Sequence, residues 1–215
     1  MDEIIKKLKE GIKLSAINSD NLFNSAELLA ANNFFSPAIP LLILSAEEII
    51  KSFALSLEFF VGGTSEVKQI IEKSKNKAAD SHLFNHEDKH KLAQRLIKDL
   101  QKISPFFNLA RIFVSKKYKK HIDFFCLSNE QYKEIDKLMV DFEKFNRLKN
   151  QGLYVDNIND KWETPLSFSL SDFESCKKNV LLIRDVFSTR IKYFLDIPEG
   201  DLSLLVDALK MNQVT

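Results

Sequence analysis

Glycine and proline are scarce in this sequence, with five residues of each among 215. Most of them fall in a few short stretches, so long segments contain no residue that ends or kinks a helix. This scarcity favours an all-helical protein. The 18 phenylalanines supply much of its core.

Cysteine is also scarce, since only Cys126 and Cys176 are present and no CxxC spacing occurs. The sequence shows no secretory signal at its start. Distant, unpatterned cysteines without such a signal are typical of a reduced protein. We therefore expect a cytoplasmic location.

An excess of charge and a long apolar run are both missing. Lys and Arg number 31 against 30 Asp and Glu, so the net charge of +1 gives no argument for non-specific binding to nucleic acid or membranes. The most apolar run, residues 37–46, is shorter than the roughly 20 residues that span a bilayer. We interpret it as a core helix in a single domain covering residues 1–215.

Apolar residues recur at helical spacing along most of the chain. We expect helices over residues 2–33, 36–61, 66–77, 86–114 with a bend at Pro105, 128–148, 171–195 and 202–211. The predicted fold class is an all-α helical bundle with one long irregular loop near 152–170, a length of loop that is often functional.

Several polar residues mark the expected helix boundaries. Ser36 is a candidate N-cap followed by Pro37 at the first helical position, and Gly62-Gly63 ends that helix. Ser128 and Gln131 have the spacing of a capping box. The polar run at residues 18–21 indicates a turn or a kink in the first helix.

Glu47, Glu48 and Lys51 lie inside the apolar second helix. Lys51 comes four residues after Glu47 and three after Glu48, so either carboxylate can pair with its ammonium. A helix that is apolar nearly all round is a buried one, where charges cost several kcal/mol each to remove from water. We expect these residues to form either one wall of a polar site or a purely structural ion pair.

Residues 86–90, His-Glu-Asp-Lys-His, match HExxH, the zinc-binding pattern of metallopeptidases. The match is weak, because Asp and Lys fill the two variable positions and only His121 follows as a further histidine ligand. Three interpretations of the segment are open: a zinc site, a solvated helix start, or a metal-free site for catalysis or phosphate binding. In the third case, which we favour, His86 and Lys89 act in catalysis or contact phosphate.

Arg147 and Lys149 precede Gly152 near the expected end of a helix. Basic residues there complement the helix dipole, which is an alternative to binding phosphate. Gly152 fits a helix-stopping position and would lead Tyr154 and Asp156 into the loop. We interpret the lysine-rich run at 116–120 as a solvated face rather than a contact with RNA or an acidic partner.

Taken in order, these motifs resemble the AbiV-type abortive-infection proteins, which are placed in the HEPN superfamily of helical bundles. The resemblance rests on EExxK at 47–51, HxxK at 86–89, a basic residue followed by GLYVD at 152–156, and Pro165. It spans roughly residues 20–165. GLYVD is its most specific part.

The resemblance implies a HEPN-like bundle and an anti-phage protein that halts growth of the infected bacterium. Through the superfamily it further implies a metal-independent ribonuclease that acts as a homodimer on RNA, without a cofactor. The sequence departs from the usual HEPN nuclease signature, an Arg followed by His after four to six residues. None of its arginines has a His at that spacing: Arg95, Arg111, Arg147, Arg184 and Arg190. Any catalytic site is therefore assembled differently or is absent.

Metal-free RNA cleavage needs a base, an acid and cations for the phosphate. His86 is the natural proton-transfer group, because the ordinary pKa of histidine is about 6.5. The other expected roles are phosphate binding by Lys51, Lys89 and Arg147, orientation of His86 or Lys51 by Glu47 or Glu48, and base stacking by Tyr154. Lys149 and Asp156 complete the expected RNA-binding set.

We therefore expect a protein that is quiescent until a phage-derived signal, such as a phage-encoded activator protein, releases RNA cleavage and arrests growth or translation. No membrane partner is expected. The rival hypothesis is a non-catalytic binding module, in which the Glu-Lys-His cluster is a buried polar network and the 152–170 loop contacts a phage or host protein.

Overall fold

The computed structural model describes residues 2–61, 128–154, 156–158, 161–163, 165, 167–198 and 200–201. These residues form the helices α1 (Asp2–Ala31), α2 (Phe35–Val61), α6 (Asn129–Leu153) and α7 (Leu170–Asp196) and the short strands β1 (Asp156–Ile158) and β2 (Lys161–Glu163). The expected helical fold class is confirmed for this part of the chain. The helices expected at 66–77, 86–114 and 202–211, the HExxH match and the lysine-rich run lie outside the described residues.

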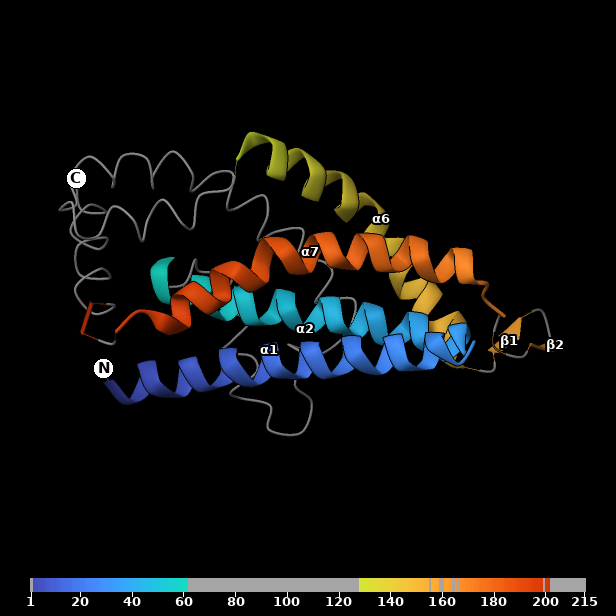
Figure 1. Ribbon diagram of the computed structural model, residues 1–215, viewed down its shortest axis with the longest axis horizontal. Helices are drawn as coiled ribbons and strands as arrows, with labels where there is room; N and C mark the ends of the chain where they lie inside the picture. Colours follow the sequence, from blue (N-terminus) through green and yellow to red (C-terminus); the bar gives the residue numbers. More distant parts are fainter. Residues whose placement is uncertain are drawn as a thin grey trace.

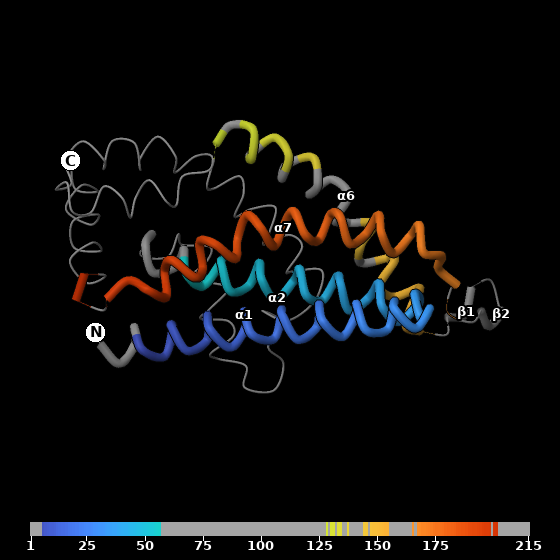
Figure 2. Tube along the Cα trace, in the orientation of Figure 1, coloured from blue at the N-terminus to red at the C-terminus, as the bar shows by residue number. Residues whose placement is uncertain are grey.

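Three long helices lie side by side, with α2 between α1 and α7, and α6 runs obliquely across them (Figure 1). The tube in Figure 2 shows the same arrangement. Because α2 packs on α1, α6 and α7 at once, it buries side chains on nearly every face. This central position explains why its sequence is the most apolar in the chain. Its contribution to the core is Ala38, Ile39, Leu42, Ile43, Ala46, Ile49, Ile50, Phe53 and Ala54.

α1 continues without interruption through the polar run at residues 18–21, so the expected turn is not present. Ser19 is buried and donates to the carbonyl of Ser45 in α2 over 2.8 Å. Asp20 forms an ion pair with Arg184 of α7. These residues are polar because they bond to neighbouring helices, which the local sequence pattern does not reveal.

α1 ends in a Schellman motif. The amide of Phe34 donates to the carbonyl of Leu29 and the amide of Asn33 to that of Ala30, both over 2.9 Å. Asn33 has φ of 63°, the left-handed conformation that this motif requires and that Asn tolerates better than most residues. The motif turns the chain sharply into α2.

α2 begins at Phe35, one residue before the predicted N-cap Ser36. The hydroxyl of Ser36 instead accepts a hydrogen bond from the amide of Phe168 over 3.2 Å. Pro40 has no N–H to donate to the carbonyl of Ser36, four residues earlier. That carbonyl faces Gly152 of α6, where an added Cβ would lie 2.7 Å from its oxygen.

α6 begins as predicted, with Ser128 and Gln131 forming the expected capping box. It extends to Leu153, five residues past the predicted end. Gly152 is therefore a helical residue, and the prediction that it stops the helix is wrong. Its role is to let α6 approach the first turns of α2, because any side chain would collide with Ser36 or Pro40.

The segment expected to be an irregular loop contains a small antiparallel hairpin, with Asp156 opposite Glu163 and Ile158 opposite Lys161. Its strands are three residues each, too short to show an alternating pattern in the sequence. The hairpin lies beyond the ends of α1 and α7 (Figure 1). α7 follows it and begins at Leu170, one residue before the predicted start at Ser171. Ser169 is its N-cap and forms a capping box with Asp172.

Replacing Gly152 with alanine is expected to destabilise the protein by about 1–3 kcal/mol, the usual effect of overpacking a core. The new methyl group would lie 2.7 Å from the Ser36 oxygen and 2.9 Å from Pro40 Cγ. Gly11→Ala in α1 is the matched control, because its nearest neighbour would be 3.8 Å away. Since alanine favours a helix over glycine by up to about 1 kcal/mol, urea unfolding should show Gly11→Ala as neutral or stabilising. Equal effects of the two substitutions would contradict the packing role of Gly152.

Candidate functional site

The structure joins two of the motifs that the sequence singled out. Lys149 of α6 donates to Oε1 of Glu47 in α2 over 3.0 Å, between residues 102 positions apart in the chain. Both side chains are buried, with exposed fractions of 3% for Lys149 and 0% for Glu47. The EExxK motif and the basic segment before GLYVD therefore form one polar cluster.

Glu48 and Lys51 form the second ion pair of this cluster, with 2.9 Å between Lys51 Nζ and Glu48 Oε2. Their side chains are 11% and 21% exposed, so this pair is the more open part of the cluster. Of the two carboxylates that could reach Lys51 on the helix surface, Glu48 does so, and Glu47 turns towards α6.

The close approach at Gly152 explains how Lys149 reaches Glu47. Lys149 precedes Gly152 by three residues and so lies about one helical turn away. The absence of a side chain at Gly152 brings this part of α6 against α2. Phe145, one further turn back and buried, anchors the same stretch in the core.

The remaining predicted site residues lie in different places. Arg147 is exposed on α6, and Tyr154, 61% exposed, is the C-cap of that helix. Asp156 opens β1. The structure thus places the Arg147 and Tyr154 side chains at the surface, whereas the Glu47–Lys149 pair is enclosed. His86 and Lys89 lie outside the described residues.

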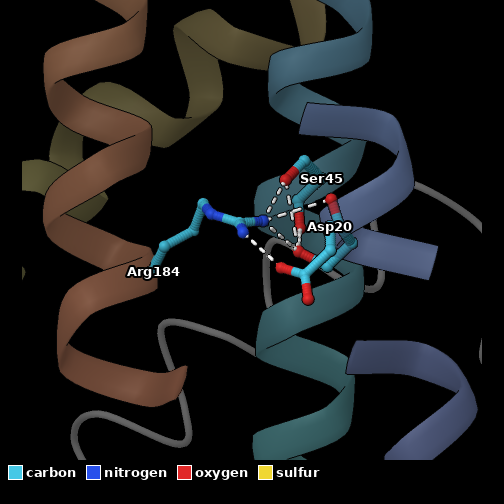
Figure 3. A network of polar contacts seen from close by, with 4 residues as sticks. Asp20, Ser45 and Arg184 are labelled. Carbon is cyan, nitrogen blue, oxygen red and sulfur yellow. Dashed lines mark hydrogen bonds and ion pairs between the residues drawn. The ribbon is translucent and has the colours of Figure 1, made fainter. Parts of the chain in front are cut away.

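A second polar cluster connects α1, α2 and α7, and its role was not predicted from the sequence (Figure 3). Nη1 of Arg184 donates to the hydroxyls of Ser19 and Ser45, each over 2.7 Å. Its Nη2 pairs with Asp20, and the guanidinium lies 4.6 Å from the ring centroid of Phe23. The only signal for this cluster was the polar run at 18–21. With its hydroxyls and carboxylate all bonded, we assign it to holding the three helices together.

A cavity of about 260 Å³ lies between α6 and α7, with Ile39 of α2 also lining it. α6 contributes Lys144, Phe145 and Leu148, and α7 contributes Asp172, Ser175, Cys176 and Asn179. Burial raises the pKa of the Cys176 thiol to about 12. Because the thiolate is the reactive form, Cys176 serves as an apolar wall rather than a nucleophile.

Within the described ranges, no group of three or more His, Cys, Asp or Glu side chains is arranged to hold a metal ion. None of the described helices is both long enough and apolar enough to cross a membrane.

The family model for AbiV, of the HEPN group, matches residues 7–173 of the chain. The match includes all of α2 and α6 and therefore both halves of the Glu47–Lys149 cluster. No curated protein and no solved structure matches the chain.

Proposed function

The chain belongs to the AbiV family of HEPN proteins, and from this premise we propose that it is a phage-defence protein that cleaves RNA without a metal ion. Membership of the family points to abortive infection. The cleavage of RNA, and the arrest of growth or translation that follows from it, are the proposal. The acting unit is a homodimer of the single 1–215 domain in the cytoplasm, quiescent until a phage-encoded activator protein releases it.

The observation that carries this proposal is the meeting of EExxK and the basic segment before GLYVD at the Glu47–Lys149 ion pair. Two motifs that are distant in sequence supply carboxylates and ammonium groups to one location. Placing four charges together against a hydrophobic core costs solvation energy. Such concentrations are common at functional sites, where the cost is offset by what the site does.

Within the cluster we assign different roles to its two pairs. Glu47 and Lys149 are enclosed, so they position the helices and the neighbouring groups. Lys51 has the more exposed side chain and is the cation that contacts the phosphate, with Glu48 holding its ammonium. Phosphate binding by Lys149 itself, which the sequence suggested, would require its pair with Glu47 to open.

The other predicted residues complete the proposed chemistry. His86 transfers the proton between the 2′-hydroxyl and the leaving oxygen, and Lys89 assists at the phosphate. Arg147 and Tyr154 are exposed near the end of α6, where a cation and a phenol ring can contact an RNA strand. Asp156 belongs to the same segment.

The enclosure of Glu47 and Lys149 favours a second candidate function, a non-catalytic binding module. In this alternative the cluster fixes the geometry of α2 and α6, and the surface around the hairpin binds a phage or host protein. Growth arrest would then occur without cleavage of RNA.

RNA cleavage tests the proposal directly. Purified protein is incubated with total bacterial RNA, with and without phage lysate and with and without EDTA, and the RNA is sized. We expect cleavage that requires the lysate and is unchanged by EDTA. Intact RNA in every condition, from a folded protein that still arrests phage growth in cells, would favour the binding module. Cleavage that EDTA abolishes would indicate a metal-dependent nuclease.

A further inference from the structure

The cavity between α6 and α7 combines features that suit one kind of ligand. Both helices pack on α2 and only slightly on each other, which leaves the space between them. Its volume of about 260 Å³ is below the ~300–1,000 Å³ of most small-molecule pockets. A single planar ring system with a polar edge fits this volume.

The walls of the cavity divide into an apolar and a polar side. Phe145 and Leu148 of α6, with Ile39 of α2, provide flat apolar contact. From α7, Asp172 and Asn179 lie one above the other on the same helical face, since they are seven residues apart. A planar heterocycle can lie against the first side and direct its edge at the second.

The hydrogen bonds of Asp172 indicate which edge is preferred. Both cap contacts from Ser169, at 2.8 Å from its amide and 2.6 Å from its hydroxyl, go to Oδ2, which leaves Oδ1 to accept from a ligand. These hydrogen bonds, the side-chain one first, lower the pKa of Asp172, so the group is an ionised carboxylate at neutral pH. A carboxylate only accepts hydrogen bonds, and Asn179 can both donate and accept.

Among the bases, guanine has the matching edge. Its adjacent N1–H and N2–H₂ groups can both donate to Oδ1 of Asp172 while its O6 accepts from Asn179. In the same orientation adenine would direct the lone pair of N1 at the carboxylate. Lys144 borders the cavity and Arg147 follows it on the same exposed face of α6, where both can reach a phosphate. We propose that this cavity binds a guanine base through Asp172 and Asn179, with the attached phosphate on Lys144 and Arg147.

This inference rests on the proposed function, because a guanine pocket on α6, the helix that also carries Lys149, would select where the RNA is bound. The same chemistry fits a free guanine nucleotide that regulates the protein. Competition distinguishes an RNA strand from a free nucleotide as the ligand. If the pocket admits an RNA strand, a strand with a single accessible guanine will compete with the mononucleotide, and if it does not, the strand will not compete.

The test is calorimetric titration of the full chain with 5′-GMP and 5′-AMP. We expect GMP to bind at least tenfold more tightly than AMP, and Asp172→Asn to remove that preference. Asp185→Asn is the charge control, because Asp185 is an exposed residue of α7 that does not line the cavity. Ser169→Ala is the cap control, since it removes the hydroxyl that donates to Asp172 but keeps the backbone amide contact and the carboxylate. Both controls should retain the preference for GMP.

Equal binding of GMP and AMP, or a preference that survives Asp172→Asn, would overturn the proposal. A short RNA containing one guanine, compared with the same RNA containing adenine, then identifies the source. Displacement of GMP by the first RNA alone supports an RNA ligand, and displacement by neither supports a free nucleotide. RNA cleavage by a protein that binds GMP and AMP equally would reject the guanine pocket and leave the proposed function intact. Selective GMP binding by a protein that never cleaves RNA would reject the proposed function and leave the guanine pocket intact.

Discussion

Replacing Lys149 with methionine is expected to lower the free energy of unfolding by about 3–5 kcal/mol, the usual cost of breaking a buried ion pair. The substitution keeps most of the length of the side chain but removes the ammonium that lies 3.0 Å from Glu47. Glu47 is fully enclosed, so its carboxylate would keep its desolvation cost while losing this partner. Urea unfolding of the two proteins gives the difference directly.

Two further variants show whether the loss arises from the pair. Lys137→Met changes an exposed lysine of the same helix and should alter stability by no more than about 0.5 kcal/mol. The double variant Glu47→Leu with Lys149→Met removes both charges and should be more stable than Lys149→Met alone, because no charge of the pair is left buried. A loss below about 1 kcal/mol for Lys149→Met would show that the pair does not hold α6 on α2.

Replacing His86 with alanine is expected to reduce RNA cleavage by about 10²–10⁴-fold, the contribution of a proton-transfer group. Far-UV circular dichroism and the elution volume of the oligomer should be unchanged, because a catalytic histidine contributes mainly to the reaction. Cleavage rates are measured on the same RNA, in the presence of lysate, for both proteins.

His90→Ala is the matched control for this prediction. In the metal-free reaction only His86 transfers the proton, so His90→Ala should retain cleavage. In a zinc site built on HExxH both histidines would be ligands, and both variants would be inactive. An unfolded His86→Ala protein would instead support a structural network, as the binding-module hypothesis expects.

Local chemistry made some parts of the fold predictable. The capping box at Ser128 and Gln131 depends on residues three apart, and the structure confirms it. The central position of α2 follows from its apolar composition, which the sequence shows directly. Features of this kind depend on neighbouring residues and on periodicity alone.

Other features depend on contacts between distant residues. Helical spacing allowed either Glu47 or Glu48 to pair with Lys51, and the choice follows from the position of Lys149 in another helix. Ser19 and Asp20 suggested a break in α1 because their partners Ser45 and Arg184 are on other helices. These pairings require the packed structure.

Gly152 shows the same limit for the candidate site. A glycine near a helix end is a common stop signal, so the sequence predicts that the helix ends at Gly152. The structure shows that the residue is needed for a close approach between α6 and α2, which no local pattern indicates. That approach is what brings Lys149 to Glu47 and makes the two motifs one cluster.

The most direct test of the central claim, that the open edge of this cluster acts on RNA, is the cleavage rate of Lys51→Met compared with Lys177→Met. Both lysines are partly exposed, at 21% and 25%, and each pairs with a glutamate, Lys51 at 2.9 Å and Lys177 at 2.7 Å. Only Lys51 belongs to the cluster. We predict that both variants fold and that Lys51→Met alone loses about 10²–10³-fold in cleavage, as expected for removing a group that stabilises charge on the phosphate. A folded Lys51→Met protein that cleaves RNA at the wild-type rate would contradict the claim.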